Sequence, residues 1–91
     1  MSDVVDNAAK SRFELVEDGF LAFADYRRRD GVLAITHVEA DPALRGKGAA
    51  GRLMEGALAL IRAEGLKVRP LCPYAVAYIA RRPEHQDLVA A

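Results

Sequence analysis

Residues 41–57 read DPALRGKGAAGRLMEGA, and this stretch decides how the rest of the chain is arranged. A preceding strand must end at Asp41-Pro42, because proline restricts the residue before it and has no N–H to donate to a sheet. From Ala49 the apolar period is helical, in a stripe formed by Leu53, Met54, Ala57, Leu58, Leu60 and Ile61. The stretch therefore predicts a glycine-rich loop that leads into an amphipathic helix over 49–64, capped by Gly65.

Two hairpins are predicted before this helix. Strand-like runs at 12–17, 20–27 and 32–40 are separated by Asp18-Gly19 and Asp30-Gly31. An Asp-Gly pair between two strands favours a tight hairpin, because both turn residues need positive φ angles. The three runs are therefore expected to form an antiparallel meander.

A fourth strand and a second helix are predicted after the first helix. Residues 66–72 have the pattern of a strand, in which Pro70 favours an irregular ladder or a position at the edge of the sheet. Pro73 suits the start of a short helix over 74–82, and Pro83 ends it. The expected order is β-β-β-α-β-α, with the fourth strand parallel to the third. We therefore expect an α+β (α/β) fold, with helices packed on a mixed, mainly antiparallel sheet.

The composition indicates a single domain over residues 1–91, with 1–10 held loosely. Thirteen basic and thirteen acidic side chains balance, which disfavours nucleic acid or an anionic membrane as a partner. A single cysteine excludes an internal disulfide and suits a reducing compartment. No apolar run reaches the roughly 18 residues that span a bilayer, and the first residues lack the layout of a signal peptide. These features predict a cytoplasmic protein.

The residues alone leave two interpretations of the glycine-rich loop open. The N-terminus of a helix carries unpaired N–H groups and about half a positive charge, so small residues there let an anion reach the backbone. Arg45, Lys47 and Arg52 add positive charge around the loop. The alternative is a surface loop whose glycines permit close packing of helix and sheet. A dinucleotide fingerprint is excluded, because residues 41–45 separate the loop from the strand and no acidic residue follows about 20 residues on.

The loop and its neighbours resemble a known family. Residues 45–50, RGKGAA, resemble the [Q/R]-x-x-G-x-[G/A] signature of the GNAT N-acetyltransferase superfamily, whose loop binds the pyrophosphate of coenzyme A. THVE at 36–39 and CPY at 72–74 resemble further motifs of a minimal, single-domain GNAT-like family of about this length. The resemblance implies acetyl-CoA as the cofactor. The binding residues that it implies are Val38, Ala40, Arg45, Gly46, Lys47, Gly48, Ala49, Ala50, Cys72 and Tyr74.

The resemblance also bears on the site for the acceptor, the molecule that receives the acetyl group. Larger members of the superfamily carry one or two helices between their first two strands, and these helices wall the acceptor site. The tight turn at Asp18-Gly19 leaves no room for them, so the acceptor side is expected to be open. The expected function is transfer of an acetyl group from acetyl-CoA to an exposed primary amine of a peptide, protein or polyamine, by direct attack.

Four side chains are candidates for catalysis. Glu39 and His37, two residues apart on one face of the predicted strand, are alternative general bases for the amine. Cys72 either lies close to the thioester or carries the acetyl group as a nucleophilic thiolate at a helix N-terminus. The superfamily often has a tyrosine near Tyr78 that protonates the departing thiolate, although Tyr78 is one residue early in the family pattern.

Two other functions are also compatible with the sequence. Because the helices that wall the acceptor site in larger members are missing, the chain is also compatible with a coenzyme A or acyl-CoA binding module that has no catalytic activity. If the loop is only structural, the domain is an interaction partner, either a monomer or a weak homodimer that pairs through an exposed strand edge.

Overall fold

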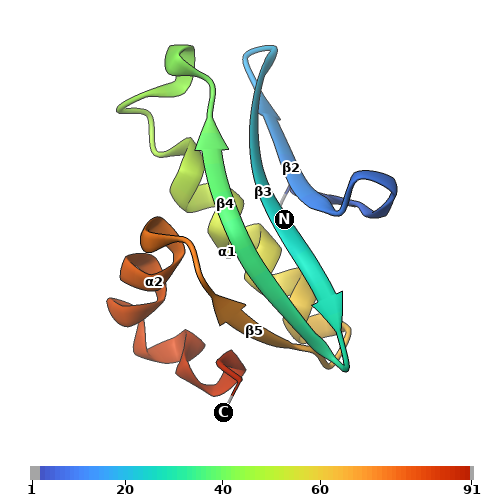
Figure 1. The fold of residues 1–91 in the computed structure, drawn as a ribbon. Helices are drawn as coiled ribbons and strands as arrows, with labels where there is room; N and C mark the ends of the chain where they lie inside the picture. The colour runs from blue at the N-terminus through green and yellow to red at the C-terminus, as the bar shows by residue number, and fades with distance from the viewer. Residues whose placement is uncertain (1–2, 91) are drawn as a thin grey trace.

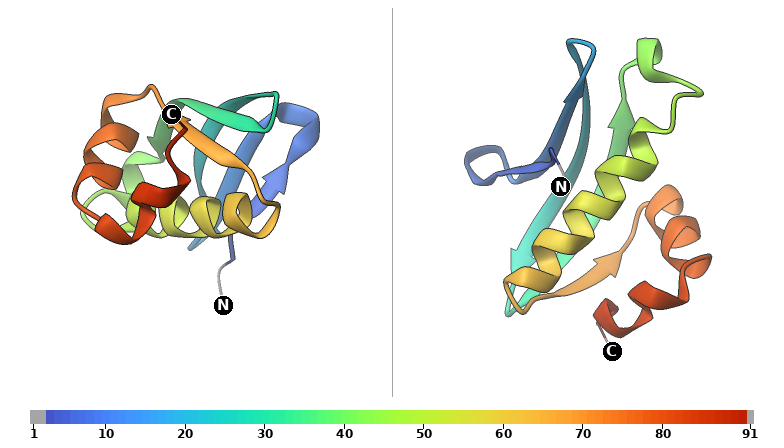
Figure 2. Two further views of the ribbon diagram at one scale, coloured as in Figure 1. Left: turned by 90° about the horizontal axis from the view of Figure 1, so that it is seen from below. Right: turned by 180° about the vertical axis from the view of Figure 1, so that it is seen from behind.

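The computed structural model describes residues 3–90, which form a five-stranded sheet with a long helix across one face (Figures 1 and 2). The strands are β1 (Val5–Asn7), β2 (Arg12–Glu17), β3 (Phe20–Arg29), β4 (Val32–Ala40) and β5 (Lys67–Pro70), and they lie in this order across the sheet. The helices are α1 (Ala49–Ala63) and α2 (Pro73–Ala80), with 3-10 turns η1 (Ala8–Lys10), η2 (Pro42–Leu44) and η3 (Pro83–Leu88). Neighbouring strands are antiparallel except β5, which runs parallel to β4. Over residues 3–90, neither helix is long and apolar enough to cross a bilayer.

The predicted order of strands and helices is confirmed from residue 12 onward, and both hairpins have the predicted turn geometry. Asp18 and Gly19 have φ angles of 53° and 80°, and Asp30 and Gly31 have φ angles of 52° and 79°. Aspartate tolerates this left-handed conformation, and glycine adopts it without steric cost. Gly65, with φ 70°, follows the end of α1 as predicted. The predicted parallel pairing of the last strand is also confirmed.

The start of the chain corrects one prediction. The sequence predicts a loosely held segment over 1–10, whereas the structure forms β1 and η1 there and buries Val4; residues 1 and 2 lie outside the described part. Three residues are too few to show the alternation that marks a strand in the sequence. β1 is also held by a residue distant in the chain, because the Tyr26 hydroxyl donates to Asp6 Oδ1 at 2.6 Å. η1, which connects β1 to β2, is a single turn. Neither this connection nor the turn at Asp18-Gly19 therefore has room for the helices that wall the acceptor site in larger members of the superfamily.

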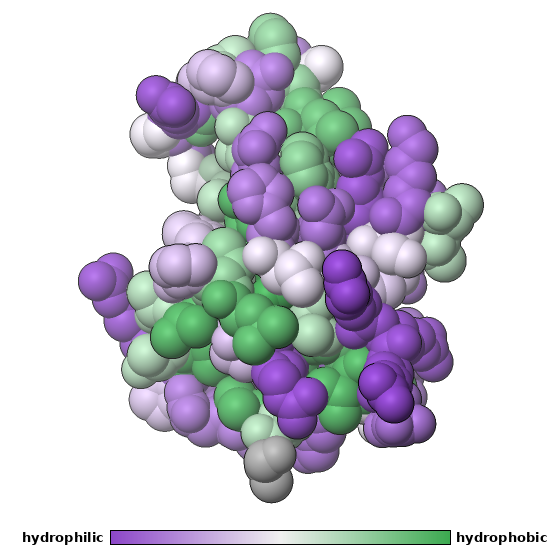
Figure 3. Space-filling model, in the orientation of Figure 1, coloured by the Kyte–Doolittle hydropathy of each residue, from purple (hydrophilic) through white to green (hydrophobic). Residues whose placement is uncertain are grey.

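The core lies between α1 and the sheet. In β2, β3 and β4 alternate side chains point towards α1, as the two-residue period of a strand requires. The largest fully buried side chains are Phe13, Ile35, Leu44, Leu53, Met54, Leu58, Ile61 and Val68. In the part of the chain that the structure describes, no helix crosses the opposite face (Figure 1). Seen from that side, the surface mixes hydrophilic and apolar side chains (Figure 3).

β4 and β5 separate after four residue pairs (Figure 1). Their ladder runs from Val32–Lys67 to Ile35–Pro70, and the N–H groups of Leu71 and Cys72 then both donate to Ile35 O, at 3.0 and 3.1 Å. β4 continues over 36–40, where no strand among residues 3–90 pairs with it on this side. We call the resulting gap between 36–40 and the start of α2 the split.

A bulge in β4 lies at the start of the split. Tyr26 of β3 pairs with Ile35 and Asp25 pairs with His37, which leaves Thr36 without a Cα partner in the register of β3 and β4. An extra residue in one strand bends that strand and increases its twist. The bend therefore helps to separate the end of β4 from β5.

The C-terminal segment closes the outer edge of β5. Val68 and Val89 form an isolated parallel bridge, and the N–H of Ala90 donates to Val68 O at 2.8 Å. η3 is tied to α1 by Arg62, whose guanidinium donates to the two oxygens of Asp87 at 2.6 and 2.9 Å. The chain's own backbone thus occupies the edge of the sheet beside α2.

Acidification is expected to destabilise the fold through ion pairs such as Arg62–Asp87. The hydrogen bond from Arg62 lowers the pKa of Asp87 below its usual value. A carboxylate with a depressed folded-state pKa stabilises the fold above its unfolded pKa, and this contribution is lost as the pH falls through the folded pKa. We expect the melting temperature to decrease once the pH is below about 4. Asp87→Asn is expected to melt at a lower temperature than the wild type at neutral pH. Its melting temperature should decrease less than that of the wild type on acidification, and equal decreases would contradict this account.

Candidate functional site

The first turn of α1 presents backbone N–H groups without acceptors. Gly48 is the N-cap residue with a φ of 76°, and the first bond of the helix runs from Arg52 N–H to Gly48 O at 3.1 Å. Among residues 3–90, the N–H groups of 48–51 meet no acceptor. Free N–H groups and the helix dipole both attract negative charge. The turn therefore suits an anionic group such as a phosphate.

Small residues keep this turn accessible. A Cβ atom on Gly48 would lie 3.1 Å from Nη1 of Arg52, which is tighter than most real contacts. A side chain at Gly48 would also be strained, because L-residues rarely adopt this φ. Glycine at this position therefore avoids a clash and leaves the backbone open to a ligand.

The other predicted loop residues surround the same turn. Gly46 also has a positive φ, of 74°. Arg45 and Lys47 are exposed, which leaves their positive charges at the surface of the loop. Ala49 is buried beneath the turn and Ala50 is half-buried. The structure thus brings the predicted loop residues together at one helix N-terminus.

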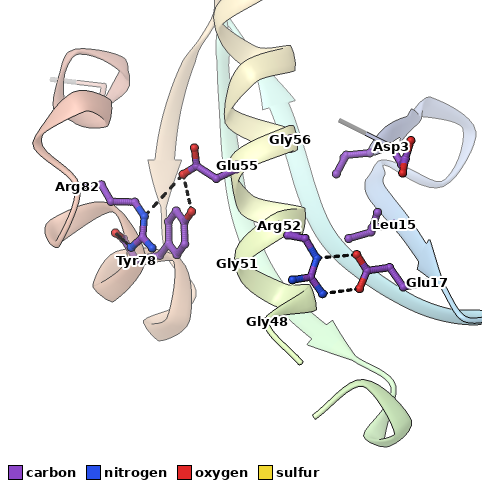
Figure 4. Close-up of a pocket in the computed structure, with 11 residues that line it drawn as sticks. Asp3, Leu15, Glu17, Gly48, Gly51, Arg52, Glu55, Gly56, Tyr78 and Arg82 are labelled. Carbon is purple, nitrogen blue, oxygen red and sulfur yellow. Dashed lines mark hydrogen bonds and ion pairs between the residues drawn. The ribbon is translucent and has the colours of Figure 1, made fainter. Parts of the chain in front are cut away.

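Arg52 is held at this turn by two partners. Its Nε and Nη2 each donate to the Glu17 carboxylate at 2.6 Å (Figure 4). Nη2 also donates to Lys47 O at 2.7 Å. The hydrogen bond from Arg52 lowers the pKa of Glu17. The sequence predicts the charge of Arg52 near the loop but not this carboxylate, because Glu17 lies at the end of β2, 35 residues away.

The split edge of β4 carries a second set of backbone donors. Asp41 N–H donates to Leu21 O of β3 at 3.0 Å. Since successive residues of a strand direct their N–H groups to opposite sides, those of Ala40 and Val38 point to the side from which β5 has departed. The side chains of these two residues pack half-buried against the core. Val38 and Ala40 therefore face the split with their backbone.

His37 and Glu39 lie together on the open face of the sheet. Nε2 of His37 is 3.0 Å from Oε1 of Glu39, and the two side chains are 54% and 60% exposed. The His37 ring also lies near the ring of Phe23, with centroids 6.1 Å apart. The prediction that His37 and Glu39 share one face is confirmed. Both are direct chain neighbours of the backbone donors at the split.

Cys72 and Tyr74 lie on the other side of the split. Cys72 is the N-cap residue of α2 and is 8% exposed. The side chain of Tyr74 reaches the first turn of α1, where its hydroxyl oxygen is 4.0 Å from the position of a Cβ on Gly51. Burial raises the pKa of Tyr74. The end of β4, the first turn of α1 and the start of α2 thus border one region.

The Tyr78 ring also approaches the first turn of α1, with Cε2 3.7 Å from the position of a Cβ on Gly51, while its hydroxyl belongs to a cluster between α1, α2 and η3. Its hydroxyl donates to Oε2 of Glu55, which is also 2.8 Å from Nε2 of His85. The guanidinium of Arg82 lies over the Tyr78 ring, 3.7 Å from its centroid. Burial and the hydrogen bond to Glu55 raise the pKa of Tyr78 well above its usual range. These contacts anchor α2 to α1 and η3. Because its pKa is raised, the Tyr78 phenol also releases its proton less readily.

A pocket of about 600 Å³ runs along the exposed side of α1 from its first turn. Tyr78 and Arg82 lie on one side of the helix, and Leu15 and Glu17 lie on the other (Figure 4). Three glycines of this part of the chain also line it, namely Gly48, Gly51 and Gly56. Within residues 3–90, no three histidine, cysteine, aspartate or glutamate side chains are placed to hold a metal ion.

Comparisons with known proteins agree with this fold. Residues 12–88 match a family model described as GCN5-related N-acetyl-transferase. The structure is similar to the NMR solution structure of a GCN5-like protein from Staphylococcus aureus, provisionally assigned as an N-acetyltransferase, with a TM-score of 0.73 and 23% sequence identity. The similarity covers 100% of this chain and 92% of that one, and at this identity it supports the fold alone. No curated protein matches the chain.

Proposed function

The chain belongs to the GCN5-related N-acetyltransferase family, and from this premise we propose that it transfers an acetyl group from acetyl-CoA to an exposed primary amine. The prediction of a GNAT-like fold and of N-acetyltransferase chemistry is confirmed at the level of family and fold. The donor, the class of acceptor and direct attack by the amine are our proposal.

The observation that carries this proposal is the set of free N–H groups at 48–51 beside the split. A diphosphate fits such a turn, because several N–H donors and the helix dipole act on its charge together. A Cβ on Gly48 would crowd Nη1 of Arg52, so glycine lets this guanidinium lie against the turn. The exposed side chains of Arg45 and Lys47 add positive charge around the same position.

Acetyl-CoA would supply the acetyl group as an activated thioester. The N–H groups of Val38 and Ala40, which face the split, suit negative charge that develops on a carbonyl oxygen. As the amine forms the new C–N bond and the C–S bond of the thioester breaks, Glu39 or His37 would accept the proton that the amine loses. Coenzyme A would leave as a thiolate that takes a proton from solvent. Because both side chains are exposed on the open face, we propose an acceptor that approaches from solvent, such as a peptide, a protein or a polyamine.

Cys72 is assigned a supporting role in this proposal, and Tyr78 is not. Cys72, at the border of the split and nearly buried, would contact the thioester without forming a covalent bond to the acetyl group. The predicted role of Tyr78 as the acid draws no support from its contacts, since its hydroxyl hydrogen is directed to Glu55. Tyr74, whose hydroxyl reaches the first turn of α1, remains a proposed cofactor-binding residue.

Two experiments test the proposal in sequence. Calorimetric titration with acetyl-CoA is expected to show saturable binding below millimolar concentration, and its absence would refute the proposed donor. A thiol-release assay then compares a lysine-containing peptide and a polyamine with the same peptide acetylated on its amines as the control. Binding without thiol release for every amine would instead indicate a coenzyme A binding module.

Replacement of one base candidate is expected to have a modest effect. Since His37 and Glu39 lie 3.0 Å apart on one face, each can accept the proton when the other is absent. We expect His37→Ala and Glu39→Gln each to lower kcat by no more than about threefold and the double variant to lower it about a hundredfold, at the low end for general base catalysis. Initial rates of thiol release measure this. An unchanged kcat in the double variant would exclude both residues as the base.

A further inference from the structure

Glu17, the last residue of β2, places a carboxylate beside a turn that suits an anion. By charge alone, this carboxylate would weaken the binding of a phosphate. Its contacts indicate a different effect. Arg52 turns the Nε–Nη2 side of its guanidinium to Glu17, with both bonds at 2.6 Å, and Nη2 also donates to Lys47 O at 2.7 Å. Glu17 and the Lys47 carbonyl therefore fix the direction of the guanidinium.

The remaining nitrogen of Arg52 faces the free turn of α1. Nη1 donates to no acceptor among residues 3–90 and lies 3.1 Å from the position of a Cβ on Gly48. Because a guanidinium is planar, fixing its Nε–Nη2 side also fixes where the two N–H bonds of Nη1 point. These two donors therefore stand next to Gly48, the first residue of the free turn.

We propose that Glu17 is a positioning residue for acetyl-CoA, which holds Arg52 so that Nη1 adds two donors to the backbone site for the diphosphate. This inference rests on the proposed function, because the diphosphate is that of acetyl-CoA. An arginine that is already held loses less rotamer freedom when it binds a phosphate than an arginine that rotates freely. Arg52 itself then becomes a binding residue in addition to the loop backbone.

The sign of one measurement separates this role from simple charge repulsion. If the Glu17 carboxylate acted mainly by repelling the anion, its removal would tighten binding of acetyl-CoA. If it acts mainly by holding Arg52, its removal weakens binding. The side chains of Arg52 and Glu17 are 52% and 25% exposed, so solvent and salt screen the repulsion, while the direct hydrogen bonds still fix the geometry.

A double-mutant cycle on acetyl-CoA affinity, measured by calorimetry, tests the proposal. We expect Arg52→Ala to weaken binding about tenfold, as the loss of a charged hydrogen bond does. Glu17→Ala is expected to weaken it about threefold in the wild-type background, but to weaken it no further, or to tighten it, when Arg52 is alanine. Glu17→Gln, which keeps an acceptor oxygen, is expected to lie between wild type and Glu17→Ala. If Glu17 had a purely structural role, Glu17→Ala would weaken acetyl-CoA binding by the same factor whether or not Arg52 is present.

Two controls separate this proposal from the proposed function. Asp87→Ala removes a similar bidentate pair, Arg62–Asp87, near η3, and is expected to leave acetyl-CoA affinity unchanged. S-acetyl-pantetheine lacks the diphosphate, so its affinity should be the same for wild type and all variants. If wild type binds acetyl-CoA and folded Glu17→Ala and Glu17→Gln bind it equally well or more tightly, the positioning role is overturned while the function stands. If wild type binds no acetyl-CoA, both are overturned.

Discussion

Gly48→Glu is expected to weaken acetyl-CoA binding on the order of a thousandfold, because two or three charge-assisted hydrogen bonds from the backbone would be lost together. Gly48 has a φ of 76°, and a Cβ there would lie 3.1 Å from Nη1 of Arg52. The new side chain would therefore push into the first turn of α1 and displace the guanidinium. Its carboxylate would also repel the diphosphate and could take the N–H groups of 48–51 for itself. Calorimetric titration with acetyl-CoA measures the effect.

Gly65→Glu is the matched control for this substitution. Gly65 has a similar φ, of 70°, and follows the opposite end of α1. Within residues 3–90, leaving out 64–66, no heavy atom lies within 4 Å of the position of its Cβ. Both variants should lose about 1–2 kcal/mol of unfolding free energy from the strained φ, but only Gly48→Glu should lose affinity. An unchanged affinity in folded Gly48→Glu would refute the assignment of the diphosphate to this turn.

Phe13→Ala is expected to lower the free energy of unfolding by about 3–5 kcal/mol. Phe13 is 1% exposed, lies on β2 facing α1, and packs on the ring of Tyr26 with centroids 4.9 Å apart. A domain of 91 residues has a total stability of about 5–14 kcal/mol, so this loss removes a large share of it. Urea unfolding measures the change as a lower midpoint at an unchanged slope.

Phe20→Ala makes the same deletion at an exposed position and serves as the control. Phe20 starts β3 and is 42% exposed, so its removal leaves little cavity. We expect a change of about 0.5 kcal/mol or less. Equal losses for the two variants would mean that the stability does not depend on the core between α1 and β2 in the way described.

The parts of the fold that the sequence predicts correctly are those with local causes. Asp18-Gly19 and Asp30-Gly31 determine their turns by their own φ preferences. The apolar stripe of α1 follows from the helical period, and its buried residues include Leu53, Met54 and Leu58 as predicted. The loop before α1 is predicted because small residues and glycines at a helix N-terminus are recognisable in a short stretch of sequence.

The features that the sequence does not reveal depend on residues that are far apart in the chain. Nothing near Arg52 identifies Glu17 as its partner, and nothing near Glu55 identifies Tyr78 and His85, which the fold brings to it from α2 and η3. The bulge at Thr36 is also hidden, because it exists only relative to the pairing of β4 with β3. Such features follow from tertiary packing and require the structure.

The bridge between Val68 and Val89 also limits how copies of this chain can join. A second molecule that extends the sheet needs a row of unpaired backbone groups to dock on, and the C-terminal segment already fills that row beside β5. The far side ends in β1, which is only three residues long and includes Asp6 and Asn7, residue types that sheets disfavour. A second molecule would therefore meet a partly paired edge on one side and a three-residue strand on the other.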